Sequence, residues 1–386
     1  SIIPADRPAF FTNPWKGIRS LLDQNPEHPF SKVSQKEIEA GFGSFSRFME
    51  TCGIRYHKES DGNQFIITPA GTLKPTWYVP SSMSAGSAAL KRKKKILIVG
   101  IKGLKGFGAD QMASTLKRFH PDIRAVTVQF PGREQAGDLM CERMAWDLET
   151  PHVLEKFAAV LSRSADNADT LGLPAILGVH RFAELKEKIE SIIKKPVFEI
   201  PTLAPSVTGL RMKEAFLSRA SEAGIETCSQ TVKKIDVDTG GNFVFTITRG
   251  LVEERVTAEH VVLATGRFLG RGLCIKEERI HEALFDLPVT QPGNRSLWYE
   301  RDFFDPQGHA VNRAGVETDP VFRPLDANGD VFHPRLFAAG GILAHQDWKR
   351  EKSGSGISIS SAFKAVSSIP CGTAGSKREE FGIHKA

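Results

Sequence analysis

The sequence predicts an α/β fold built around parallel sheet and divided into more than one domain, and three observations predict it. Short apolar runs of the kind that parallel sheets bury recur at residues 95–100, 260–266 and 336–341. Between the first two runs, apolar residues at helical spacing alternate with strand-like segments, as is typical of α/β regions. The length of 386 residues exceeds the usual size of one compact domain.

The composition is that of a folded protein in a reducing compartment. Hydrophobic residues make up 40% and charged residues 25% of the chain, and no apolar run approaches the roughly twenty residues of a membrane span. The five cysteines are scattered and never form a CxxC pair, which predicts neither a disulfide framework nor a metal site. The opening residues do not resemble a signal peptide, and a start on Ser1 suggests a fragment. We expect a cytoplasmic protein whose net charge of +6 favours anionic partners.

The amino-terminal part is predicted to contain one long helix and a β-rich segment. Ser34 and Glu37 form a capping-box pattern before a helix that ends near Gly53. Residues 62–78 alternate β-favouring residues with turn residues. The Ser/Ala/Gly-rich stretch 81–89 predicts a linker at a domain boundary.

The next segment is predicted to be an α/β domain. Its first strand, 95–100, follows a basic run that we interpret as a solvated flank instead of a nucleic-acid or membrane patch. Helices are expected at 109–118 and 153–161. A strand-like run at 174–179 leads into a helix whose apolar stripe contains Phe182, Leu185, Ile189 and Ile192.

The last domain is predicted to open with a helix and a β-meander. Gly224 would end the helix as a C-cap. Two strands flank the turn 238–242, and residues 251–256 supply a third strand. The meander leads directly into the apolar strand 260–266.

Two of the apolar strands end on glycine, which predicts a ligand site. Gly266 and Gly340 have no Cβ, so the main chain there can pass close to a flat or phosphorylated ligand. A helix opening at Gly356 would direct free N–H groups and its positive dipole end toward an anion such as a reduced flavin. Without a ligand, the same features would be ordinary strand ends and a glycine-capped helix. The predicted cofactor-binding residues are Thr265, Gly266, Gly340, Gly341, Gly354, Ser355 and Gly356.

Five segments together carry a resemblance to a known family. They are TPAGTLKPTWY (68–78), IPTLAPSVTGLRM (200–212), VVLATGRFLGRGL (261–273), WYERDFF (298–304) and LFAAGGIL (336–343). In this order and approximate spacing they resemble the B subunit of anaerobic glycerol-3-phosphate dehydrogenase. Members of that family begin with a strand and a glycine-rich dinucleotide loop, whereas this chain opens after that unit, and its loop at 100–106 does not follow GxGxxG.

The resemblance implies an FAD/NAD(P)-binding-type parallel sheet with a β-meander and an inserted second domain. It implies a flavin-dependent oxidoreductase, with FMN as the family's flavin and FAD also possible, that oxidises sn-glycerol 3-phosphate to dihydroxyacetone phosphate and passes electrons to quinone. Its partners would be a catalytic, FAD-bearing A subunit and an iron–sulfur C subunit that anchors it peripherally on the inner membrane, and no nucleic-acid partner is expected. The implied domains are 1–90 (remainder of the flavin domain plus linker), 91–200 (inserted domain), 201–369 (flavin-binding domain) and 370–386 (disordered tail).

Oxidation of a phosphorylated polyol requires a base for the hydroxyl proton and cations for the phosphate. His345 follows the last glycine-ended strand and is the candidate base, with Arg267 and Arg323 as candidate anion-binding residues. Lys349 and Arg350 are further cations nearby, and each of these side chains is equally compatible with a structural or surface role. Two alternatives stay open, namely a non-catalytic electron-transfer or structural subunit and a flavin reductase of the fumarate-reductase kind. Hydrolase and ATPase functions have no supporting motif.

Overall fold

The chain forms two compact units, each built from two separate stretches of sequence. The computed structural model describes residues 11–60, 62–134, 137–165, 167–249 and 252–370. Unit 1 comprises Ser1–Gly17 and Ser46–Cys228, and unit 2 comprises Ile18–Phe45 and Ser229–Ala386. The expected domain boundaries at 90/91 and 200/201 both lie inside unit 1, and all but the first residue of the expected tail lies outside the described residues. Over the part of the chain that the structure describes, no helix has the length and apolar character needed to cross a membrane.

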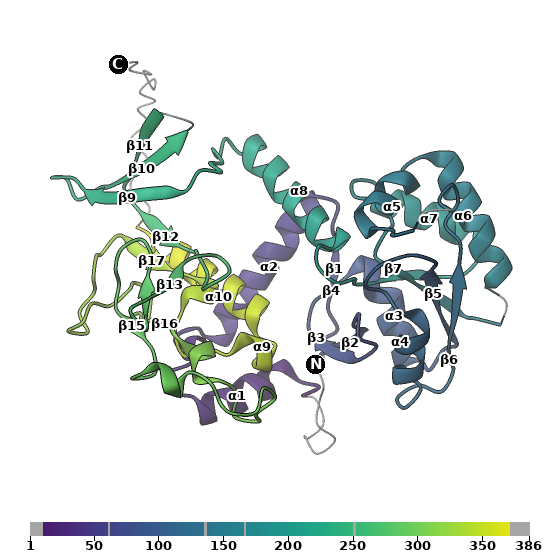
Figure 1. Ribbon diagram of the computed structural model, residues 1–386, viewed down its shortest axis with the longest axis horizontal. Coiled ribbons are helices and arrows are strands. Elements are labelled where there is room, and N and C mark those ends of the chain that lie inside the picture. Colours follow the sequence, from purple (N-terminus) through teal and green to yellow (C-terminus); the bar gives the residue numbers. More distant parts are fainter. Residues whose placement is uncertain (1–10, 61, 135–136, 166, 250–251, 371–386) are drawn as a thin grey trace. The chain divides into compact units, whose positions relative to one another are not determined.

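Unit 1 is built on a four-stranded parallel sheet, which confirms the α/β prediction (Figure 1). Its strands are β5 (Ile96–Ile101), β6 (Ile123–Val128), β7 (Thr170–Pro174) and β8 (Val197–Ile200), in the order β6-β5-β7-β8. Every residue of β5, β7 and β8 is buried, as expected for apolar strands covered on both faces. The strand predicted at 174–179 is displaced, because β7 ends at Pro174 and the chain then turns through Gly178 with a φ of +73°.

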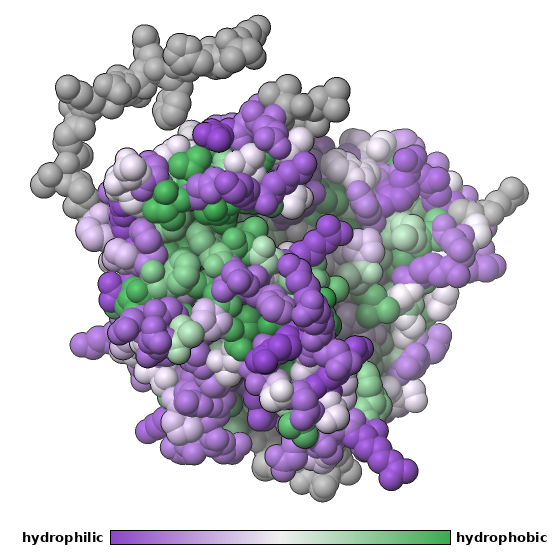
Figure 2. Space-filling view, turned by 60° about the vertical axis from the view of Figure 1, so that its left-hand side comes forward, coloured by the Kyte–Doolittle hydropathy of each residue, from purple (hydrophilic) through white to green (hydrophobic). Residues whose placement is uncertain are grey.

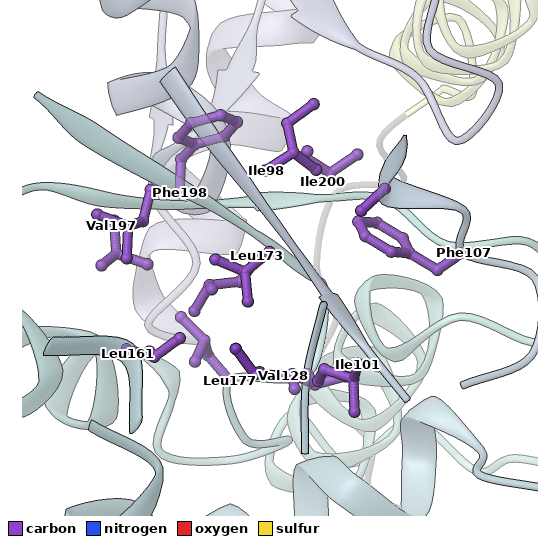
Figure 3. Close-up of a cluster of buried hydrophobic side chains, with 14 of the residues drawn as sticks. Ile98, Ile101, Phe107, Val128, Leu161, Leu173, Leu177, Val197, Phe198 and Ile200 are labelled. Atoms are coloured by element: carbon purple, nitrogen blue, oxygen red, sulfur yellow. The ribbon is translucent and has the colours of Figure 1, made fainter. Parts of the chain in front are cut away.

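Six helices of unit 1 accompany this sheet within the described residues. They are α3 (Ser81–Lys91), α4 (Ala109–Leu116), α5 (Cys141–Leu148), α6 (Pro151–Ser164), α7 (Phe182–Ile193) and α8 (Val207–Glu222). The predicted helices at 109–118, 153–161 and from Phe182 onward are confirmed. Figure 3 shows Ile98, Leu173 and Phe198 of the strands gathered with Leu161 of α6 in the buried cluster that holds the unit together.

The linker predicted at 81–89 is wrong, because these residues form most of helix α3. Its small residues Ser82, Ser87 and Ala89 are buried, and a Cβ added to Gly86 would lie only 2.4 Å from the ring of Phe198. Small side chains permit this close approach of a helix to the sheet. Composition alone does not distinguish such a helix from a flexible Gly/Ser-rich linker.

The predicted long helix and β-rich segment of the amino-terminal part are confirmed, and two further helices that were not predicted precede them. Helix α1 is Pro14–Gln24, the short helix η1 is Pro29–Lys32 and helix α2 is Gln35–Thr51. The Ser34 N–H donates to Glu37 Oε2 at 2.7 Å, and the Glu37 N–H donates to Ser34 Oγ at 3.3 Å, which completes the capping box of α2. Within the predicted β-rich segment, strands β2 (Gln64–Ile67) and β3 (Leu73–Thr76) form a hairpin, and β1 (Tyr56–His57) pairs with β4 (Val79–Pro80).

Unit 2 combines the predicted β-meander with a parallel strand pair (Figure 1). The meander contains β9 (Val232–Val237), β10 (Phe243–Arg249) and β11 (Val252–Ala258), and β12 (Val261–Leu263) runs parallel to β17 (Leu336–Ala338). Two antiparallel strand pairs lie between them in sequence, the hairpin of β13 (Leu273–Lys276) with β14 (Arg279–Glu282) and the more distant pair of β15 (Val289–Thr290) with β16 (Gly315–Val316). The remaining elements are η2 (Arg295–Leu297), η3 (Ala310–Arg313), η4 (Gly340–Ile342), α9 (Trp348–Glu351) and α10 (Gly354–Ser367).

Candidate functional site

The two glycine-ended strands meet at one edge of the parallel pair in unit 2. Because β12 and β17 are parallel, with Val262 opposite Phe337, their carboxyl ends lie at the same edge. Gly266 and Gly340 have φ values of +67° and +73°, which only glycine adopts without strain. A Cβ added to Gly341 would lie 3.6 Å from the Cα of Gly266. The structure therefore brings together the two strand endings that the sequence singled out.

Helix α10 joins these turns as the third predicted element. The N–H of Gly340 donates to Ser361 Oγ of α10 at 2.9 Å, and a Cβ on Gly340 would lie 3.2 Å from Ser358 Oγ. The helix begins at Gly354, two residues earlier than expected, and its N-cap residue Ser353 makes no side-chain cap. The first N–H groups of α10 therefore donate no hydrogen bond to the N-cap side chain and can donate to a ligand.

The residues of the first turn of α10 differ in their surroundings. A Cβ on Gly356 would approach the Phe30 ring to 3.0 Å, and a Cβ on Gly354 would lie 3.4 Å from the Trp348 ring. Ser355, between them, is exposed. A side chain at Gly356 would crowd the Phe30 ring of η1, whereas Ser355 is open to substitution.

Arg267 directly follows Gly266, and its side chain donates hydrogen bonds to backbone carbonyl oxygens. Its Nε donates to Gly341 O at 2.8 Å, and its Nη2 donates to Leu343 O at 3.1 Å and to Gln346 O at 2.9 Å. Its Nη1 donates to Asn312 O. Arg267 lies at the predicted site, but its hydrogen-bonding groups are directed at carbonyl oxygens and not toward a ligand phosphate.

His345 lies between two glutamates in the loop after η4. Its Nε2 contacts Glu317 Oε1, and its Nδ1 lies 3.6 Å from Glu27 Oε2. The hydrogen bond with His345 lowers the pKa of Glu317 against the effect of burial, and Thr290, which donates at 2.8 Å, adds to the shift. The imidazole is therefore hydrogen-bonded to one carboxylate and lies within ion-pair distance of a second. Sequence reasoning missed both glutamates, because neither belongs to a local motif.

A buried network fixes the segment between η4 and α10. The N–H of Phe30 donates to His28 Nδ1 at 3.1 Å, so the other ring nitrogen of this buried histidine carries the proton that faces Glu351 Oε2 at 3.2 Å. Burial opposes ionisation of Glu351, but hydrogen bonds from His28, Asp347 N–H and Ser353 hold its pKa below the usual value. These contacts anchor α9 and the start of α10.

Arg323 is not brought to this edge. It pairs with Asp319 at 2.7 Å and lines a pocket with Arg335 and Phe337, at the amino end of β17. Arg350 donates to Asp305 O at 2.6 Å and to Pro306 O. Lys349 lies 5.6 Å from the centre of the Trp348 ring. Of the predicted catalytic residues, only His345 and Arg267 therefore lie next to the glycine turns.

Comparisons with known proteins identify the family. A family described as FAD binding domain matches residues 12–357. The probable B subunit of anaerobic glycerol-3-phosphate dehydrogenase from Halobacterium salinarum is 32% identical over 92% of this chain and 83% of its own length. The chain belongs to the B-subunit family of anaerobic glycerol-3-phosphate dehydrogenases. The B subunits of Vibrio cholerae and Vibrio vulnificus are 31% and 30% identical, over 95% and 92% of this chain and 86% and 82% of their own lengths.

Membership of the B-subunit family confirms the resemblance found in the sequence and the expected FAD/NAD(P)-binding-type fold. It also confirms flavin as the cofactor, and the name of the matching family, FAD binding domain, specifies FAD. The residues at the edge of β12 and β17 fit such a ligand in three respects. Thr265 Oγ1 is buried and has no hydrogen-bond partner among the described residues. A Cβ on Gly266 would meet no atom within 4 Å, which leaves room for a ligand. The start of α10 offers uncapped N–H groups.

We expect Ser355→Asp to lower the reduction potential of the bound flavin by some tens of millivolts. The added carboxylate would oppose the positive end of the α10 dipole, whose interactions are worth about 0.3 to 2 kcal/mol. About 59 mV corresponds to a tenfold change for a one-electron step. Ser367→Asp is the matched control, since it places the same charge on an exposed serine at the other end of α10. Spectroelectrochemical titration measures the reduction potential of the flavin in both variants. Equal shifts of this potential in the two variants would mean that the start of α10 does not face the flavin.

Proposed function

We propose that this chain is the flavin-dependent subunit of a quinone-linked glycerol-3-phosphate dehydrogenase, in which sn-glycerol 3-phosphate is oxidised to dihydroxyacetone phosphate. The observation that carries the proposal is the convergence of Gly266, Gly340 and α10 in a chain that is 32% identical to a B subunit over nearly its whole length. Gly266 leaves room for a flat cofactor, Gly340 lets the chain turn beside α10, and the start of α10 offers uncapped N–H groups. Their convergence accounts for a flavin-binding role on physical grounds.

The residues of the site have distinct parts in this function. The flavin, when bound, supplies the two-electron acceptor for the hydride that leaves the substrate carbon. The uncapped N–H groups at Gly354 and Ser355 stabilise negative charge at the ligand edge nearest α10. With its Nε2–H donated to the Glu317 carboxylate, the His345 ring offers the lone pair of Nδ1, which makes it the candidate acceptor of the hydroxyl proton.

A specific observation favours the second candidate function, an electron-transfer subunit without substrate chemistry. Both arginines that were candidates for the substrate phosphate are occupied, Arg267 by four backbone carbonyls and Arg323 by Asp319. In this alternative the partner subunit oxidises the substrate, and the flavin in this chain receives the electrons afterwards.

We further propose a catalytic, FAD-bearing A subunit and an iron–sulfur anchoring C subunit as partners, which would hold this cytoplasmic chain peripherally on the inner membrane. The names of its relatives describe one subunit of a larger complex. In the WYERDFF segment of unit 2, Phe303 and Phe304 are 79% and 67% exposed. Exposed aromatic side chains are typical of interfaces, and Figure 2 shows that hydrophobic residues also gather on the surface of the molecule between hydrophilic ones.

The decisive experiment follows the flavin absorption band after anaerobic mixing with sn-glycerol 3-phosphate. The isolated chain loaded with FAD and the complex with its partner subunits are compared, and sn-glycerol 1-phosphate serves as the control substrate. Bleaching in the isolated chain assigns substrate oxidation to this subunit. Bleaching in the complex beyond that of the A subunit's own FAD, with none in the isolated chain, assigns electron transfer to this subunit, and no bleaching of its flavin in either preparation contradicts both functions. Reduction of an added quinone by the complex, together with fractionation of cells, tests the quinone linkage and the membrane location.

A further inference from the structure

Arg267 makes an unusual set of contacts for an arginine beside a ligand site. Its four hydrogen bonds reach Gly341, Leu343 and Gln346 of the turn after β17, and Asn312 of η3. All four acceptors are backbone carbonyl oxygens. A guanidinium group presents its donors as a rigid planar fork, so four simultaneous bonds fix the relative positions of the segments that supply the acceptors.

The same turn is also held by His345, whose ring contacts the Glu317 carboxylate, and by hydrogen bonds between other groups. Gln346 Nε2 donates to Gly340 O at 2.8 Å and to Leu343 O at 3.0 Å, and the Ala344 N–H donates to Val316 O at 3.1 Å. None of these groups is charged. Arg267 is the residue that ties the turn to the end of β12, because it follows Gly266 directly in the chain.

Desolvation lowers the pKa of Arg267 to about 10, while the charges of Asp347 and Glu351 oppose this shift. The side chain therefore keeps its charge at neutral pH without a carboxylate in contact with it among the described residues. Placing an arginine in such an environment is costly unless its donors are satisfied. The four carbonyl oxygens satisfy them.

We propose that Arg267 is a positioning residue, whose guanidinium clamps the turn 340–346 to the end of β12 and so sets where the two glycine turns face the cofactor. The inference rests on the proposed flavin site. It assigns Arg267 a role different from phosphate binding, because a ligand anion would have to displace carbonyl oxygens that the fold already supplies.

The test compares Arg267→Ala, Arg267→Lys and Arg335→Ala in the full chain purified with its partners. Arg335 is the matched control, because it also donates to a backbone carbonyl, Gly240 O at 2.8 Å, but lies directly before β17 at the opposite edge. FAD affinity is measured by fluorescence quenching, and hydrogen exchange is measured in the peptide 340–347. The clamp predicts about a tenfold or greater loss of FAD affinity and faster exchange in both Arg267 variants, since lysine cannot replace the fork. Arg335→Ala should change neither.

Chemical rescue separates geometry from charge. Ethylguanidinium should restore FAD affinity and slow exchange in Arg267→Ala, whereas ethylammonium should not. Wild-type FAD affinity in Arg267→Lys, or an unchanged hydrogen-exchange rate of the peptide 340–347 in Arg267→Ala, would contradict the proposed clamp. If this chain itself binds no FAD in the wild-type complex, the proposed function fails, while hydrogen exchange in the peptide 340–347 still decides whether Arg267 holds the turn.

Discussion

Replacement of Arg211 by Met is expected to lower the free energy of unfolding of unit 1 by about 3 to 5 kcal/mol. Arg211 lies in α8, and its side chain is 6% exposed, while that of its partner Glu199 in β8 is fully buried. Two bonds of 2.5 Å and 2.8 Å join the guanidinium to the carboxylate, and Arg211 Nε also donates to Gly178 O at 2.8 Å. Methionine preserves much of the volume but leaves a buried carboxylate without its cation. Urea denaturation measures the decrease in the free energy of unfolding, and faster hydrogen exchange in β8 would show that the destabilised part is unit 1.

The double variant Arg211→Met, Glu199→Gln is the control for this interpretation. Glutamine removes the charge but keeps an oxygen for the Leu177 N–H, which donates to Glu199 Oε1 at 2.9 Å. The double variant should therefore be more stable than Arg211→Met alone. A single variant that loses less than about 1 kcal/mol would mean that water or another cation compensates the carboxylate.

Gly315→Ala is expected to destabilise unit 2 by at least about 2 kcal/mol and to weaken flavin binding. A Cβ on Gly315 would lie 2.5 Å from Ile342 O and 2.6 Å from Ala344 N. These are backbone atoms, so no side chain can rotate away to relieve the overlap. β16 would have to separate from the turn after β17, which breaks the 3.1 Å bond from Ala344 N–H to Val316 O. Thermal unfolding and FAD titration measure the two effects.

Gly293→Ala provides the comparison within the same unit. A Cβ at Gly293 meets no atom within 4 Å, and this glycine is not in the left-handed region. The stability and the flavin affinity of the Gly293→Ala variant should remain close to those of the wild type. If Gly315→Ala behaved in the same way, β16 and the turn would have to be loosely packed against each other.

The elements that sequence reasoning placed correctly carry local, periodic signals. The buried strands β5 and β17 are continuous apolar runs, and α2 begins at a capping box whose two residues are three positions apart. The glycine turns were found because Gly266 and Gly340 each follow such a run. In these places the chain's own backbone preferences and the tertiary structure agree.

The contacts that sequence reasoning missed join residues that are distant in the chain. Nothing near His345 indicates Glu317 as its partner, and nothing near Arg267 indicates that its donors face carbonyl oxygens. Arg323 was grouped with them by its position in the sequence, but the fold places it at the amino end of β17. Helix α3 was mistaken for a linker because its small residues pack against a strand that lies far along the chain.

The order of the segments also determines when each unit can fold during synthesis. Most of unit 1 comes from one continuous stretch, whereas unit 2 needs residues 18–45 together with residues after 228. Lys364 Nζ donates to Lys32 O at 2.6 Å, and the two residues are 332 positions apart in the sequence. At translation rates of about 5 to 20 residues per second, the ribosome therefore adds them to the chain about 17 to 66 s apart. Phe30, which packs on Gly356, remains without this native neighbour through nearly all of that interval. On the ribosome the flavin site is therefore among the last parts of the molecule that can be completed, and the early segment depends on protection from aggregation until then.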